Sequence, residues 1–110
     1  MTQTQAQSLI REMVDRIVSG FDPERVILFG SYARGSADRD SDVDLLVVLS
    51  KIEGSRRQKS VEIRVALHAM GLAKDIVIRT PEEFDQEKNI PGSIGRSAAM
   101  EGRVLYERAH

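Results

Sequence analysis

The chain has 110 residues, of which 41% are hydrophobic and 30% are charged, so we expect a single domain over 1–110 with a modest core. The formal net charge of −1 gives no electrostatic reason for direct nucleic-acid binding. Cysteine is absent, which excludes disulfides and thiolate metal sites, and no apolar run approaches the ~20 residues of a membrane span. We therefore expect a cytoplasmic protein without a membrane partner.

The first 20 residues predict an amphipathic helix that ends near Gly20. Its apolar side chains recur at spacings of three and four, which places them on one helix face. These side chains are Ala6, Leu9, Ile10, Met13, Val14 and Ile17. We expect this face to pack against a sheet.

Two short apolar runs, Val26–Phe29 and Asp44–Leu49, are bounded by turn residues and predict buried strands. The first run ends abruptly in Gly30-Ser31, where a helical turn can begin and present free backbone N–H groups to a phosphate. Gly30 has no Cβ to keep the backbone from a ligand. Ser31 can cap the turn or hydrogen-bond a phosphate oxygen. This turn is therefore a candidate phosphate site.

Asp42 and Asp44 open the second apolar run and form a candidate metal site. Two residues apart on a strand, they project from one face with Cα atoms roughly 6.6 Å apart. Carboxylates this close repel each other unless a cation lies between them, and Mg²⁺ is usually bound by one or two carboxylates plus substrate phosphates. The pair beside the phosphate turn suits phosphoryl or nucleotidyl transfer. Asp38 and Asp40 precede the apolar run, and we expect them to be solvated.

Helices and strands alternate in the rest of the chain. Residues 55–70 fit either period, but their length and Gly71 favour a helix. The later patterns predict a strand over Asp75–Arg79, a helix beginning at Thr80-Pro81, a helix over 91–100, and a strand or extended tail over 104–106. Asp75 opens an apolar strand, which costs burial free energy unless a metal ion or a basic side chain pairs with it.

The connection between the first two strands is short, so we expect them to pair antiparallel within a mixed sheet. The fold class is therefore α/β (α+β). Helices can cover one face of this sheet, while the other face, which carries Asp42 and Asp44, stays open to a ligand.

The motif Gly30-Ser31, ten intervening residues and Asp42-Val43-Asp44 resembles the signature of the DNA polymerase β-like nucleotidyltransferase superfamily. The short chain is similar to the minimal nucleotidyltransferase branch, whose members are antitoxins paired with HEPN toxins. The resemblance runs from Val26 to about Tyr106. The third carboxylate of that family, on a later strand, matches Asp75.

This resemblance implies a nucleotidyltransferase fold, with a mainly antiparallel sheet, and an enzyme that transfers AMP from ATP to a hydroxyl group of a partner. It implies that Asp42, Asp44 and Asp75 are the catalytic and metal-binding carboxylates, holding two Mg²⁺ ions. Gly30 and Ser31 would hold the terminal phosphates. Arg34 would neutralise phosphate charge, or would instead pair with a carboxylate of the loop, Asp40 or Asp42.

The acceptor is the open question in the sequence, because the chain is short for a second, acceptor-binding domain. The resemblance implies a tyrosine hydroxyl of a HEPN toxin, which the chain would neutralise as an antitoxin in a hetero-oligomer. Two alternatives remain. The chain could neutralise the toxin by binding alone, or it could be the catalytic subunit of a small-molecule, aminoglycoside-type nucleotidyltransferase.

Overall fold

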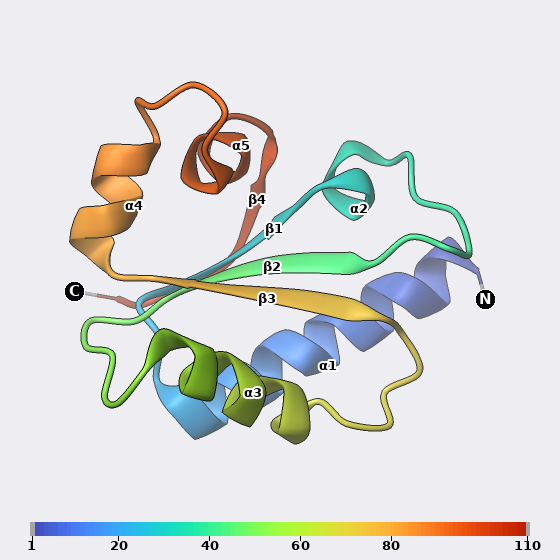
Figure 1. Ribbon diagram of the computed structural model, residues 1–110. Helices are drawn as coiled ribbons and strands as arrows, with labels where there is room; N and C mark the ends of the chain where they lie inside the picture. The colour runs from blue at the N-terminus through green and yellow to red at the C-terminus, as the bar shows by residue number, and fades with distance from the viewer. Residues whose placement is uncertain (1, 110) are drawn as a thin grey trace.

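The computed structural model describes residues 2–109 and forms a four-stranded sheet with helices packed on it (Figure 1). In chain order the elements are α1 (Gln3–Phe21), β1 (Arg25–Phe29), α2 (Ser31–Arg34), β2 (Val43–Val48), α3 (Arg56–Ala66), β3 (Lys74–Arg79), α4 (Pro81–Glu87), α5 (Ile94–Glu101) and β4 (Arg103–Glu107). Residue 1 of the predicted first helix lies outside the described residues. None of the described helices is long and apolar enough to cross a membrane.

The strands lie in the order β3-β2-β1-β4. β1 pairs antiparallel with both β2 and β4, whereas β2 and β3 run parallel. This pairing confirms the predicted mixed, mainly antiparallel sheet. In the register, Asp44 of β2 lies opposite Phe29 of β1 on one side and Asp75 of β3 on the other. The end of β1 and the first acidic residues of β2 and β3 therefore meet at one end of the sheet.

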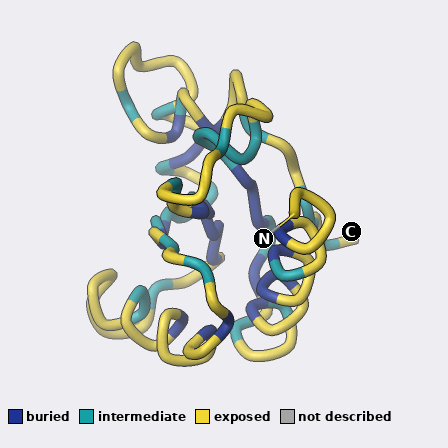
Figure 2. The backbone as a smooth tube through the Cα atoms, turned by 90° about the vertical axis from the view of Figure 1, so that its right-hand side faces the viewer, coloured by how far each residue is buried: buried dark blue, intermediate teal, exposed yellow. Residues whose placement is uncertain are grey.

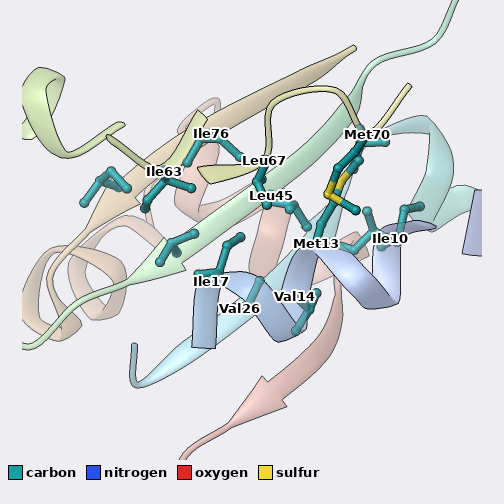
Figure 3. Packing of buried hydrophobic residues seen from close by; sticks show 14 of the residues in the cluster. Ile10, Met13, Val14, Ile17, Val26, Leu45, Ile63, Leu67, Met70 and Ile76 are labelled. Carbon is teal, nitrogen blue, oxygen red and sulfur yellow. The ribbon is translucent and has the colours of Figure 1, made fainter. Parts of the chain in front are cut away.

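The first face of the sheet is closed by α1 and α3. It carries alternate strand residues, which are Val26, Leu28, Val43, Leu45, Val47, Ile76 and Ile78. Met13 and Ile17 of α1 and Ile63 of α3 are each 0% exposed and point toward these strands (Figure 3). The buried residues accordingly lie where the helices and the sheet face one another, and the exposed residues lie on the outer sides (Figure 2). The amphipathic first helix is therefore confirmed.

Local signals decide where α1 begins and where α3 ends. The Thr2 hydroxyl accepts a hydrogen bond from the Gln5 N–H, while the Gln5 side chain accepts one from the Thr2 N–H, which is a capping box. The predicted helix over 55–70 is shorter in the structure, because the chain turns after Ala66 through Ala69, whose φ is 66°. This turn brings Met70 back into the core.

The second face of the sheet is apolar at one end and acidic at the other. The apolar end consists of Ile27, Leu46 and Val48, and the acidic end carries Asp44 and Asp75. Phe84 of α4 and Ala98 of α5 pack against the apolar end. The prediction that helices cover only one face therefore needs correction, because strand alternation also places large apolar side chains on the second face, and these require a cover.

Candidate active site

The turn at the acidic end is built around a glycine in an unusual conformation. Gly30 follows β1 directly and is the N-cap of α2, with φ 74° and ψ −156°, a region essentially restricted to glycine. A Cβ at this position would clash with Oδ2 of Asp44. The sequence predicted this glycine for the approach of a phosphate. The structure gives a second reason, which is the approach of the Asp44 carboxylate.

Ser31 is the first residue of α2 and does not cap it. Gly30 occupies the N-cap position, where no side-chain hydrogen bond is made. Of the two roles predicted for Ser31, the structure therefore excludes the cap, and the contact with a phosphate oxygen stays a prediction. The loop after α2 is stabilised by Asp38, whose Oδ1 accepts hydrogen bonds from the Asp40 N–H and the Ser41 hydroxyl. Asp38 and Asp40 are exposed, as expected.

Three carboxylates lie near this turn. Asp44 and Asp75 are direct neighbours in the parallel register of β2 and β3. Asp44 is partly buried, whereas Asp75 is exposed. Asp42 is exposed and comes one residue before β2 begins at Val43. Asp44 thus lies beside Phe29 of β1 and a glycine that leaves room for it, with two further acidic residues nearby.

The electrostatics of Asp44 reflect this crowding. Burial raises the pKa of the Asp44 carboxyl, the negative charges of Asp75 and Asp42 raise it further, and the Arg34 guanidinium lowers it. The ionised Asp44 carboxylate is therefore insufficiently compensated by the protein itself. A cation between these carboxylates would remove the repulsion, and an all-oxygen donor set of this kind suits Mg²⁺. The residues present thus fit a divalent metal ion.

Among the described residues, Asp75 is paired with a basic side chain and is not part of a ready-made cluster of three carboxylates. Its Oδ1 accepts a hydrogen bond of 3.0 Å from Nη2 of Arg64 in α3. Within residues 2–109, no group of three acidic or histidine side chains is already arranged to hold a metal ion. The structure therefore brings Asp44 and Asp75 to adjacent strand positions and pairs Asp75 with an arginine, which is one of the two partners that its sequence position predicted.

Arg34 lies near the carboxylates but pairs elsewhere. Its Nη1 lies 3.3 Å from Oε2 of Glu101 in α5, so the alternative pairing with Asp40 or Asp42 is wrong, while the role toward phosphate stays a prediction. Sequence reasoning could not find this partner, because Glu101 is 67 residues away and only the packing of α5 beside β1 brings it close. Sequence reasoning missed Arg64 for a different reason, because an exposed arginine on a helix is ordinarily solvated.

A large cavity of the molecule shares Arg34 with this site but contains none of its carboxylates. It has a volume of about 750 Å³ and is situated between the start of α1, α2 and β4. Tyr32, Arg39 and Leu105 are among its lining residues, and the lining includes none of the three carboxylates. The chemistry of the carboxylates, and not the size of this cavity, therefore locates the candidate active site.

A mixed sheet with a glycine turn and carboxylates at one end is the arrangement that the sequence predicted for a nucleotidyltransferase fold. The family described as "Nucleotidyltransferase domain" matches residues 8–103, and the chain belongs to this family. Family membership makes the protein a transferase with a nucleotide substrate.

Two archaeal relatives show how similar the chain is to proteins with more specific names. The chain is 31% identical over 102 residues to a Methanocaldococcus jannaschii protein that carries the name protein adenylyltransferase MJ0604, covering 91% of this chain and 97% of that protein. It is 32% identical over 81 residues to the protein adenylyltransferase MntA of Thermococcus cleftensis, covering 73% of this chain and 80% of MntA.

Solved structures share the fold. A crystal structure assigned as a nucleotidyltransferase of Sulfolobus solfataricus superposes with a TM-score of 0.68 at 23% identity, covering 96% of this chain and 84% of that chain. A toxin-antitoxin structure with AMP-PNP superposes with a TM-score of 0.58 at 19% identity, covering 89% of this chain and 73% of that chain. At these identities the similarity supports the nucleotidyltransferase fold, which confirms the fold prediction.

Proposed function

We propose that this chain is a protein adenylyltransferase that transfers AMP from Mg²⁺-bound ATP to a hydroxyl group of a partner protein. The observation that carries the proposal is the position of Asp44 beside Asp75 and the Gly30 turn, where the charges of Asp75 and Asp42 leave Asp44 insufficiently compensated. The names of the archaeal relatives support adenylyl transfer to a protein.

Asp42 and Asp44 are the residues that would hold Mg²⁺, with Asp75 as a third ligand for one of two ions. Bound Mg²⁺ would neutralise phosphate charge and stabilise both the attacking and the leaving oxygen. The donor set consists of carboxylate oxygens at the open end of the sheet, where the nucleotide phosphates can complete the coordination.

The remaining residues of the site bind and orient the nucleotide. The backbone at Gly30 and the Ser31 side chain hold the terminal phosphates, and Arg34 offsets their negative charge. In the transfer, the acceptor hydroxyl oxygen forms a bond to the α-phosphorus while the bond between that phosphorus and the bridging oxygen breaks, releasing pyrophosphate. The hydroxyl proton moves to the Asp75 carboxylate. Asp75 must leave Arg64 for this role.

The acceptor is a tyrosine of a HEPN toxin, and the chain acts as the antitoxin. Two of the solved structures with this fold are toxin-antitoxin complexes, one of them of MntA with HpeT. The acidic end of the second face is open, so a folded partner can present a side chain to it. Adenylylation would add bulk and negative charge to the toxin, and complex formation would supply the proximity that transfer requires.

Transfer from differently labelled ATP tests the proposal. The partner protein, incubated with the chain and Mg²⁺, should acquire label from ATP labelled at the α-phosphate and none from ATP labelled at the γ-phosphate. Asp44→Asn is the control that should transfer neither label. Label from the γ-phosphate would identify a kinase and contradict the proposal. Full toxin neutralisation without transfer of either label would favour an antitoxin that acts by binding alone.

A further inference from the structure

Asp75 lies between partners of opposite charge. On one side it is the register neighbour of Asp44, and the two negatively charged carboxylates repel each other. On the other side its Oδ1 accepts the hydrogen bond of 3.0 Å from Arg64. The Asp75 carboxylate has lone pairs for more than one partner, but Arg64 on α3 and a cation beside Asp44 attract it from different elements, so they compete for the orientation of this one side chain.

The fold gives Arg64 its place. α3 packs along β3, and the short connection from Ala66 to Lys74 returns the chain so that the last turn of α3 faces the start of β3. Arg64 lies in that last turn and Asp75 is the second residue of β3. The pair therefore joins two elements that are fixed by the core through Ile63 and Ile76.

We propose that Arg64 is a positioning residue that holds Asp75 away from Asp42 and Asp44 until a divalent cation draws it into the site. This inference rests on the proposed metal role of the carboxylates. In the metal-free protein, Arg64 relieves part of the repulsion between Asp75 and Asp44. When the cation binds, it replaces Arg64 as the positive partner of Asp75.

The exposure of the pair fits a contact that opens easily. The Arg64 side chain is 50% exposed and the Asp75 side chain is 55% exposed. Exposed ion pairs stabilise weakly and are screened by salt, whereas a buried pair would be costly to separate. Water can solvate the guanidinium once Asp75 has turned to the metal, so the exchange leaves no buried unpaired charge.

Metal affinity in the absence of nucleotide tests the proposal. The probe is Mn²⁺, which like Mg²⁺ takes carboxylate ligands, and its dissociation constant is measured by calorimetry at low salt. Arg64→Ala should tighten Mn²⁺ binding by about two- to five-fold, in keeping with the loss of a weak competing pair. An Mn²⁺ affinity equal to or weaker than that of the parent would overturn the proposal.

Arg57→Ala is the matched control. Arg57 is exposed on the same helix and takes part in none of the ion pairs found between described residues. Its removal takes away the same charge but frees no carboxylate, so the Mn²⁺ affinity should stay at the parent value. Equal tightening in both variants would show a general charge effect and would overturn the role of Arg64.

A double-mutant cycle with Asp75→Asn identifies the route of the effect. If Arg64 acts through Asp75, Arg64→Ala should change the Mn²⁺ affinity little when Asp75 is already asparagine. Persistence of the full tightening in that background would overturn the proposal.

Asp44→Asn distinguishes a failure of this inference from a failure of the proposed metal-binding function. Mn²⁺ binding that is unaffected by Asp44→Asn would contradict the metal site itself, whereas binding that needs Asp44 but ignores Arg64 would contradict only the positioning role.

Discussion

The two ends of the second sheet face differ sharply although one strand supplies both. β2 places Leu46 and Val48 at the apolar end, where they are 0% and 2% exposed beneath α4 and α5. Two residues before Leu46, the same alternation places Asp44 at the acidic end, beside Asp75. The helical cover reaches the apolar side chains and leaves Asp75 exposed.

The difference shows how a short chain separates stability from chemistry. A cover over the acidic end would desolvate three carboxylates, which costs free energy unless each is paired. Leaving that end open avoids this cost and keeps a place for a nucleotide and an acceptor. Substitutions at the apolar end should therefore change stability, and substitutions at the acidic end should change transfer.

The largest effect is expected from Asp44→Asn at the acidic end. The change keeps the shape of the side chain and removes a charge that the metal needs, so transfer should fall on the order of 10³-fold. Because the pKa of Asp44 is raised in the folded protein, its ionised form destabilises the metal-free fold at neutral pH. The metal-free variant should therefore melt no lower than the parent. Transfer rates and thermal melts measure both expectations, and a variant with parental transfer would contradict the role of Asp44.

At the apolar end, Leu46→Ala should produce the opposite result. Leu46 is fully buried, so its truncation should lower the free energy of unfolding by about 3 kcal/mol. Transfer per folded molecule should stay close to the parent value, because Leu46 points to the covered end. Denaturant unfolding measures the change. Val61→Ala, at a side chain that is 51% exposed, is the control and should alter stability little. A stable Leu46 variant with impaired transfer would break the division between the two ends.

Gly30→Ala tests the turn that adjoins Asp44. The new Cβ would clash with the Asp44 carboxylate in a backbone conformation that costs about 1–3 kcal/mol for residues other than glycine. Both ATP affinity and stability should fall. Gly35→Ala is the matched control, since Gly35 also has a positive φ of 76° but has open space where a Cβ would lie. Calorimetry with Mg²⁺ present should show a loss for the Gly30 variant only, and equal ATP affinity in all three proteins would show that the turn is merely structural.

The smallest effect concerns Glu83, which anchors α4 at the covered end. Arg56 binds its carboxylate with two hydrogen bonds of 2.8 and 2.6 Å, and this pairing is the main reason that the pKa of Glu83 is lowered to about 2. A lowered pKa stabilises the fold above the unfolded value of 4.5, and this contribution is lost as the pH falls toward 2. Glu83→Gln should therefore lower the free energy of unfolding by up to about 1 kcal/mol at pH 7, since the pair is partly exposed. Chemical unfolding should show the difference shrinking in acid, and a difference independent of pH would contradict this role.

The sequence predicted the strands of the site well, because the apolar runs are too short for helices and are bounded by turn residues. The second strand begins at Val43, one residue before the predicted Asp44. The pairing of β2 with β3 could not be derived from periodicity, since a parallel neighbour is chosen by the packing of the crossover helix α3. That Asp75 lies beside Asp44 was therefore expected from the family resemblance alone.

The arginines were the least predictable part of the chain. An exposed arginine near the start of a helix is ordinarily solvated, but Arg56 bonds to Glu83 and to the carbonyl of Ile78 at the edge of the sheet. Arg64 and Arg34 likewise pair with residues on other elements, 11 and 67 residues away along the chain. A long charged side chain can reach several neighbours, and only the packed fold decides which of them is near.

Intact-mass spectrometry of the partner protein is the most direct test of the central claim that the acidic end carries out adenylyl transfer. The partner is incubated with ATP, Mg²⁺ and either the parent chain or the Asp42→Asn/Asp44→Asn double variant. The account predicts a gain in mass corresponding to adenylyl groups with the parent and no gain with the double variant. A partner that gains no mass yet is fully neutralised by both proteins would contradict it.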